Sequence, residues 1–247
     1  MADLPIRILH EATKIEPFIV LHKPAGLASA PLKEGDESAY TQAAARYPAL
    51  NAVSGRKAVE HGLVHRIDTA TEGIVLIAAS QDFYAHILAA QEEGKFIKTY
   101  WAQCHHQGKQ ALQGFPPPPA AVKINSWREG TVSVCSRFRP YGAKGREVRP
   151  VVESSGRAAL NKAVDCTYTT EVELRPLSDD SYTATCTIRK GYRHQVRCHL
   201  AWIGFPIIGD KVYNADVQDR DEGVQFKATE ISFPDLYSDK ILHYRID

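Results

Sequence analysis

The apolar residues of this chain fall into short runs bounded by turn formers, a pattern typical of buried strands. Residues 74–79 form an almost uninterrupted apolar run rich in β-branched residues, and Leu63 and Val64 form a shorter run before it. Such runs predict strands in the interior of a sheet. Residues 5–26 predict one or two further strands, which end in a turn at Lys23-Pro24-Ala25-Gly26.

Helical patterns alternate with these runs. Residues 81–93 predict the clearest helix, with Ser80 as its N-cap, Gly94 as its stop and an apolar side made by Phe83, Ile87, Leu88 and Ala90. Two other segments, residues 37–47 and 194–202, also predict helices.

The middle of the chain predicts strands. Residues 96–104 predict one, and Pro116–Pro119 predict a stiff extended connector after it. Short alternating segments follow between residues 120 and 189, for example 131–134 and 182–188. Strands with interspersed helices favour an α+β fold, and we expect one domain spanning residues 1–247.

Composition narrows the class of protein. The chain has 247 residues, 44% of them apolar and 24% charged, as in ordinary soluble globular proteins. No apolar stretch reaches the length of a membrane span and the N-terminus lacks a signal pattern, so we expect a cytoplasmic protein with no membrane partner. The five cysteines are scattered without a C-x-x-C, which argues against a disulfide framework and a zinc module.

The histidines suggest a metal site only weakly. Close pairs occur at His61/His65, His105/His106 and His194/His199, but none has a carboxylate or cysteine at ligand spacing. We therefore expect no metal.

Charge is unevenly distributed although the net charge is only +1. Residues 121–200 contain 14 Lys and Arg against 8 Asp and Glu, whereas residues 201–247 contain 5 against 9. The middle of the chain could therefore present a face that binds phosphate, and a solvated surface without a partner is the alternative.

The most informative polar cluster lies between the two apolar runs. Arg66, Asp68, Thr69, Thr71 and Gly73 occupy eight residues there. A carboxylate at the mouth of a strand pair, beside a cation, is a candidate catalytic group. The alternative is structural: Asp68 caps a turn through a side-chain bond to the backbone near Ala70 or Thr71. Taken alone, the segment favours the structural alternative.

Other segments favour the catalytic alternative for Asp68. The segment Phe18–Gly26 precedes His65-Arg66-Ile67-Asp68, and the segments Lys98–Tyr100, Gly191–Leu200 and Gly204–Tyr213 follow it. In this order they resemble the RluA-type pseudouridine synthases over residues 18 to 213. The strongest motif is HRID-x-x-T-x-G, which is similar to the family's HRLD-x-x-T-S-G.

The resemblance implies a fold and an activity. The fold is a central, largely antiparallel mixed sheet in two halves, with flanking helices and a cleft between the halves. The activity is the isomerisation of uridine to pseudouridine in a stem-loop of rRNA or tRNA, without cofactor or metal. Many relatives carry a small S4-like RNA-binding module before the catalytic strands, and we expect none here. We expect a monomer.

The resemblance also implies roles for three residues. Asp68 corresponds to the essential carboxylate, Arg197 to the cation that keeps it ionised, and Tyr100 to the aromatic that stacks on the flipped base. Each has a structural alternative: a turn cap for Asp68, a solvated helix residue for Arg197, and a core aromatic for Tyr100.

Further residues are expected at the substrate. Arg66 resembles the residue that fills the space of the extracted base or contacts the RNA backbone. Val196 would line the base pocket opposite Tyr100, and packing in the core is an equal alternative. Arg193, His194 and Gln195 would shape the adjoining loop. Two departures from the family pattern, Glu72 in place of Ser and Arg193 displaced by one position after Gly191-Tyr192, put the RNA-backbone contacts in question.

Phosphate contacts are expected from the basic middle of the chain, at Lys123, Arg128, Arg137, Arg139, Arg146 and Arg149. Two other functions are possible. A non-catalytic RNA-binding protein would not need the combination of Asp68, Tyr100 and Arg197. A glycoside hydrolase would need a second carboxylate, and only Glu72 lies near Asp68 in the sequence.

Overall fold

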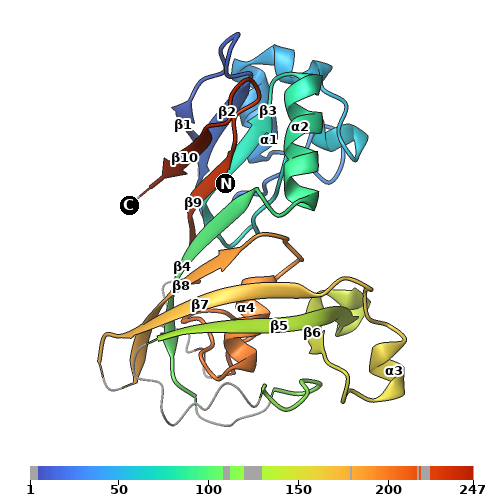
Figure 1. Cartoon of the computed structure of the whole chain (residues 1–247), viewed down its shortest axis with the longest axis vertical. Coiled ribbons are helices and arrows are strands. Elements are labelled where there is room, and N and C mark those ends of the chain that lie inside the picture. The colour runs from blue at the N-terminus through green and yellow to red at the C-terminus, as the bar shows by residue number, and fades with distance from the viewer. Residues whose placement is uncertain are drawn as a thin grey trace. The chain divides into compact units, whose positions relative to one another are not determined.

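The computed structural model describes residues 5–107, 112–119, 130–178, 180–215, 217 and 223–246. The chain forms two compact units (Figure 1). The first unit joins Met1–Lys98 to Lys227–Asp247, and the second is Thr99–Phe226. Among the helices of the described ranges, none is long and apolar enough to cross a membrane.

The first unit is built on a sheet whose strands follow the order β1-β2-β3-β9, with β10 also paired to β9. Its elements are β1 (Arg7–His10), β2 (Phe18–Lys23), α1 (Ala39–Arg46), η1 (Pro48–Ala52), η2 (Ala58–Glu60), β3 (Glu72–Ala78), α2 (Gln81–Glu92), β9 (Phe226–Pro234) and β10 (Ile241–Arg245). Strands β1, β2 and β3 pair antiparallel, as do β9 and β10, whereas β3 and β9 pair parallel. The strands predicted within residues 5–26 and at 74–79 are confirmed.

Aromatic rings fill the core of the first unit. Phe18, Phe83, Phe96 and Phe233 are fully buried. The Phe18 ring lies 4.7 Å from that of Phe83 and 5.3 Å from that of Phe233. Burying each such side chain contributes roughly 1.5–3 kcal/mol. The core therefore joins β2, α2 and β9, which are far apart in the sequence.

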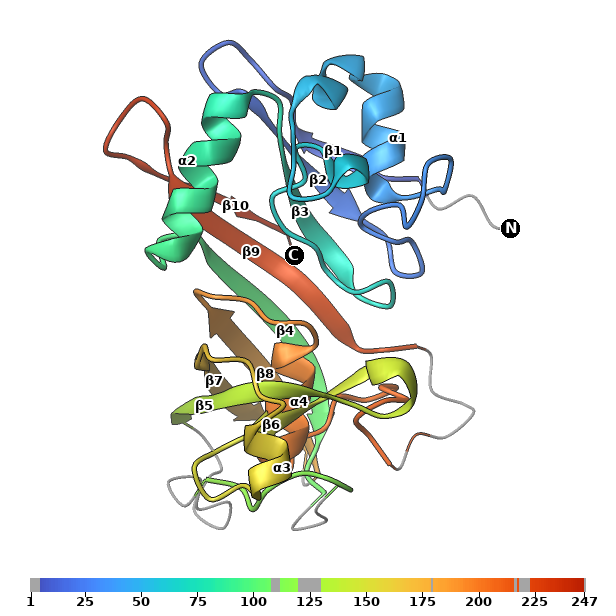
Figure 2. The ribbon, with the colours of Figure 1, turned by 90° about the vertical axis from the view of Figure 1, so that its right-hand side faces the viewer.

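Helix α2 delivers Phe83 to this core and is the helix predicted at 81–93. Its first turn is capped by the Ser80 hydroxyl, which accepts a hydrogen bond from the Phe83 N–H at 3.2 Å. Gly94 follows the helix with a φ of +71°, as expected for a glycine stop. The predicted cap and stop are both confirmed, and Figure 2 shows the helix from a second direction.

The second unit is also built on a sheet, in the order β4-β8-β7-β5-β6. Its elements are β4 (Ile97–His105), β5 (Gly130–Tyr141), η4 (Ala143–Gly145), β6 (Glu147–Val151), α3 (Arg157–Leu160), β7 (Tyr168–Pro176), β8 (Ser181–Ile188) and α4 (Gln195–Trp202). Strand β5 pairs antiparallel with β6 and β7, and β7 with β8. With the parallel pair in the first unit, these pairings confirm the predicted α+β class and the largely antiparallel mixed sheet.

Helix α4 packs on β6 and β7 of the second unit and is held there by a buried histidine. The Nε2 and Nδ1 atoms of His199 lie 2.9 Å from the Ser136 hydroxyl and 2.8 Å from the Thr170 hydroxyl. The ring also stacks on Phe138 at 4.9 Å. Burial lowers the pKa of His199 to about 3, so the imidazole is neutral at pH 7.

This buried histidine predicts a loss of stability in mild acid. The unfolded chain has a histidine pKa of about 6.5, so it binds a proton between pH 6.5 and 3 that the folded chain does not. The stability that His199 contributes is therefore fully present above pH 6.5 and is lost as the pH falls toward 3. We expect His199 alone to lower the free energy of unfolding by about 2 kcal/mol between pH 7 and pH 5.

Urea unfolding at both pH values, followed by tryptophan fluorescence, measures this loss. In a His199→Gln variant the difference between pH 7 and pH 5 should shrink by about 2 kcal/mol. The exposed His105 provides the matched control, since His105→Gln should leave the difference unchanged. If the His199→Gln variant and the unchanged protein lose the same free energy of unfolding between pH 7 and pH 5, the loss does not come from His199.

Candidate functional site

Asp68 lies in a loop that leads into β3. The loop leaves the sheet after Leu63, which bridges to Ile77, and Asp68 itself is half-buried. A turn follows in which the Thr71 N–H donates to the backbone carbonyl of Asp68 at 3.0 Å. A hydrogen bond of the main chain therefore closes this turn.

The residue before Asp68 is clamped. The buried Ser29 hydroxyl accepts from the Ile67 N–H at 3.1 Å and donates to the Ile67 carbonyl at 2.7 Å. Arg66, on the other side of Ile67, is exposed and pairs with Glu60 at 2.8 Å. Residues 65–68 do not belong to a strand. The clamp nevertheless fixes the backbone from which both side chains project.

Lys23 anchors the other side of the same loop. Its ammonium is fully buried and donates to three carbonyls, those of Pro24 at 2.9 Å, Leu27 at 2.6 Å and Thr69 at 3.3 Å. Desolvation lowers the pKa of Lys23 to about 8, opposed by the negative charge of Asp68. Within the first unit, Lys23 is therefore a cation whose field acts on Asp68.

Gly73 and Glu72 place this loop against β9. Gly73 has a φ of +129°, and a Cβ atom there would lie 2.2 Å from the Ala228 carbonyl oxygen. The glycine of the HRID-x-x-T-x-G motif is thus required by the close approach of two backbones. Glu72 pairs with Lys227 at 2.8 Å, so the charge that departs from the family pattern is neutralised locally.

His65 packs inside the first unit. Its Nε2 accepts from the Leu76 N–H at 3.1 Å, and its ring meets that of Phe96 edge-on at 5.2 Å. Burial is the main cause that lowers the pKa of His65 to about 3. In the described ranges, no group of three His, Cys, Asp or Glu is arranged to hold a metal ion.

The second unit holds Tyr100 and Arg197, the other two residues with predicted catalytic roles. Tyr100 lies on β4, is 8% exposed, and stacks on Phe226 with ring centroids 5.2 Å apart. One face of the phenol is thus covered, which fixes the plane of the ring.

Arg197 lies on α4 and is not a solvated helix residue. Its Nε and Nη2 donate to the two carboxylate oxygens of Asp210, each at 2.7 Å, and the Asp210 side chain is fully buried. Asp210 also accepts from the N–H groups of Val212 and Tyr213, at 3.0 and 3.3 Å. The pair fixes the guanidinium bidentately, a geometry that lysine could not provide.

The residues before Arg197 join α4 to its surroundings. Gln195 donates to the Thr169 carbonyl at 2.9 Å and accepts from the Tyr192 N–H at 2.9 Å. Arg193 donates to the carbonyls of Gly145 and Glu147. Val196 is buried. Gln195 and Arg193 thus secure the loop that precedes the helix.

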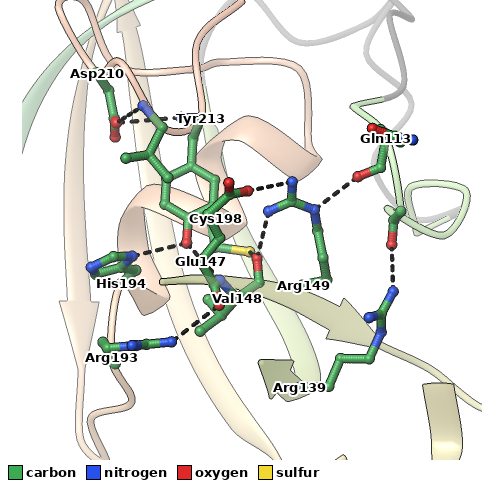
Figure 3. Close-up of polar contacts among 12 residues, drawn as sticks. Gln113, Arg139, Glu147, Val148, Arg149, Arg193, His194, Cys198, Asp210 and Tyr213 are labelled. Atoms are coloured by element: carbon green, nitrogen blue, oxygen red, sulfur yellow. Dashed lines mark hydrogen bonds and ion pairs between the residues drawn. The ribbon is translucent and has the colours of Figure 1, made fainter. Parts of the chain in front are cut away.

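His194 occupies a strained position at the start of α4, with a φ of +55°. Its Nδ1 lies 3.0 Å from the hydroxyl of Tyr213, which also accepts from the Val148 N–H at 3.0 Å. Figure 3 shows this chain of contacts running from His194 through Tyr213 to β6.

Arg149 proves to be structural, which corrects the expectation that it contacts phosphate. It is 5% exposed; its Nε donates to the Gln113 carbonyl, its Nη1 to the Val148 carbonyl, and its Nη2 pairs with Glu147 at 2.6 Å (Figure 3). A guanidinium with its donors occupied and buried cannot reach RNA. Arg137, Arg139 and Arg146 are at least partly exposed, and Lys123 and Arg128 lie outside the described residues.

Lys23, Ser29 and Asp210 were not among the predicted site residues. Lys23 offered one signal, since it ends a strand that begins with the buried apolar run Phe18–Leu21. Ser29 offered none, because its partner Ile67 is 38 residues away, and the bidentate partner of Asp210 is 13 residues away.

Comparison with known proteins connects these observations. The chain matches the family described as RNA pseudouridylate synthase over residues 17–202. This range contains Asp68, Tyr100 and Arg197.

Individual relatives are more distant. The chain is 28% identical over 213 residues to a protein of Zymomonas mobilis named ribosomal large subunit pseudouridine synthase D, covering 85% of this chain and 56% of the relative. It is 26% identical over 237 residues to an uncharacterized RNA pseudouridine synthase of Mycoplasma pneumoniae, covering 94% of this chain and 63% of the relative. The chain thus spans somewhat more than half the length of these relatives.

Solved structures agree in fold. Human RNA pseudouridylate synthase domain containing 1 superposes with a TM-score of 0.63 at 17% identity, covering 99% of this chain and 83% of the human one. Human RNA pseudouridylate synthase domain containing 4 gives a TM-score of 0.60 at 18% identity, covering 97% and 87%. By the family match and the shared fold, the chain belongs to the RNA pseudouridylate synthase family.

Proposed function

We propose that this protein is an RNA pseudouridine synthase that isomerises uridine in rRNA or tRNA, acting in the cytoplasm as a monomer. The observation that carries the proposal is the family match over residues 17–202, because that range includes the loop with Asp68. The clamping of this loop by Ser29 and Lys23 supports it. A reacting carboxylate has to be held in a fixed position.

The reaction rearranges one nucleotide without adding atoms. The bond from the sugar C1′ to uracil N1 breaks, the detached base turns, and C1′ bonds to uracil C5. The proton on C5 is lost and N1 gains one. Cleavage develops positive charge on the sugar, which an anionic carboxylate stabilises. We assign that carboxylate to Asp68.

Tyr100 and Arg197 complete the proposed catalytic set. Stacking on Phe226 holds the Tyr100 ring in one orientation, so that its phenol can act near the carbon that loses a proton. We assign the catalytic cation to Arg197, with Asp210 fixing the direction of its guanidinium. Val196 and Arg66 are assigned to the base and its vacated space.

A direct assay tests the function. Purified protein is incubated with unmodified transcripts of rRNA and tRNA, and pseudouridine is measured by nuclease digestion and mass spectrometry after cyanoethylation, which marks the new base. We expect pseudouridine at one or a few positions. Folded protein that forms none in either class of RNA contradicts the proposal.

Replacing the phenol separates chemistry from binding. In Tyr100→Phe the stacking surface remains while the hydroxyl is lost, so we expect turnover to fall roughly 10²-fold or more, as for other acid–base groups. RNA affinity should change little. Single-turnover rates and equilibrium binding to the same transcript measure the two effects, with Tyr237→Phe at an exposed tyrosine as control. Parallel losses of rate and affinity would instead indicate a structural hydroxyl.

A further inference from the structure

A basic pocket lies in the second unit beside the short helix α3. Its volume is about 410 Å³, and it is lined by Arg139 of β5 and by Gly156, Arg157, Ala158, Ala159 and Lys162. Half of these residues carry a positive charge and none carries a negative one. The others are glycine and alanine, so they leave room for a ligand to approach the backbone, and the space in front of Gly156 is open.

Among the residues that the structure describes, no carboxylate forms an ion pair with any of the three cations at this pocket, Arg139, Arg157 and Lys162. Arg149 and Arg197, by contrast, are buried and paired at 2.6 and 2.7 Å with Glu147 and Asp210. Arg149 and Arg197 thus stabilise the interior of the second unit, whereas the three cations at this pocket have no carboxylate partner among the described residues.

Arg139 gives the pocket a fixed member. Its Nη2 lies 3.4 Å from the Gly114 carbonyl, and its guanidinium lies 5.0 Å from the centre of the Tyr141 ring. Its Nε is buried and has no hydrogen-bond partner among the described residues. Arg157 and Lys162 are exposed and can close on a ligand from the rim.

We propose that Arg139, Arg157 and Lys162 form a phosphate-binding subsite for the backbone of the RNA substrate. The inference rests on the proposed function. Guanidinium and ammonium groups bind anions with several oxygens, and none of the six residues that line the pocket is acidic. A pocket of this volume is larger than one phosphate group, and its open form suits a continuous phosphodiester chain.

Salt dependence of RNA binding tests the subsite. Each phosphate neutralised contributes about 0.7 to the slope of log K against log salt for single strands and about 0.9 for duplexes. Arg157→Ala/Lys162→Ala should therefore make the slope shallower by about 1.4–1.8. Affinity should fall roughly 25- to 60-fold at 0.1 M salt and approach that of the unchanged protein near 1 M. The probe is a fluorescein-labelled RNA hairpin with uridines in its loop.

A matched variant controls for total charge. Lys33→Ala/Lys240→Ala removes two exposed cations of the first unit and should leave the slope unchanged. Both pairs of side chains are exposed, so the midpoint of thermal unfolding should not move in either variant. Equal slopes for the unchanged protein and the Arg157→Ala/Lys162→Ala variant would overturn the proposal.

Two further readouts separate the possible sources of failure. If inorganic phosphate at millimolar concentration stabilises the unchanged protein but not the variant, while the RNA slope is the same in both, the pocket takes free phosphate and the RNA proposal is wrong. If the slope falls as expected but no RNA gains pseudouridine, the subsite stands and the proposed function fails. If pseudouridine forms and the slope does not change, only the subsite fails.

Discussion

Asp68→Asn should abolish pseudouridine formation, a loss on the order of 10³-fold or more, while leaving the fold and RNA binding close to those of the unchanged protein. The amide has nearly the same shape as the carboxylate but cannot act as a nucleophile, a base or an anion. The fold should survive because the turn after Asp68 is closed by its backbone carbonyl and the residue before it is clamped by Ser29.

Pseudouridine per RNA and the urea midpoint, measured on one preparation, check this expectation. Asp239→Asn, a change of the same chemistry at an exposed position, should alter neither value. Substantial pseudouridine from the Asp68→Asn protein would remove Asp68 from the mechanism. Loss of the folded state would mean that the carboxylate is needed for structure.

Breaking the pair between Arg197 and Asp210 should have the largest effect on stability. Both side chains are buried, so removing one leaves the other charge without its partner, at a cost of about 3–5 kcal/mol. We expect this loss in the free energy of unfolding for Arg197→Met and for Asp210→Asn. The exposed pair of Lys95 and Glu93 is the contrast, because Lys95→Met should change the free energy of unfolding far less.

The double variant separates structure from chemistry at Arg197. Replacing both members by apolar residues, as in Arg197→Met/Asp210→Leu, often restores the stability that a single replacement loses. We expect the double variant to unfold at higher urea concentration than either single variant, yet to form no pseudouridine. If it regains activity together with stability, Arg197 has only a structural role.

The elements around Asp68 are predictable because their signals are local. The apolar run at 74–79 and the Ser80 cap need no distant partner to be recognised. Strand β5 shows the opposite case, since only residues 131–134 of Gly130–Tyr141 were predicted. Ser136 interrupts the apolar alternation, and its burial depends on His199, 63 positions away. Pro140 also ends the alternation of apolar and polar residues, although it belongs to the sheet, where it lies opposite Val148 of β6.

The electrostatics of the site were less predictable than its elements. A count of charges cannot tell a paired arginine from an unpaired one, so Arg149 was expected at phosphate. Glu147, two residues earlier on the same strand, was the signal that it would be paired, since alternate residues of a strand share a face. Lys23 is a comparable case, because one of its three acceptors, the Thr69 carbonyl, is 46 residues away and reaches the ammonium only in the folded chain.

The division of the first unit into two chain segments bears on the order in which the protein can fold. During synthesis from the N-terminus, β1, β2, β3 and α2 are complete long before β9, which follows the whole second unit. Until then the rings of Phe18 and Phe83 lack Phe233, their partner from β9. The second unit, which is continuous, can acquire its core first. The first unit is left as a nascent intermediate with exposed aromatic surface and an unpaired strand edge, the kind of species most exposed to aggregation and to chaperone binding.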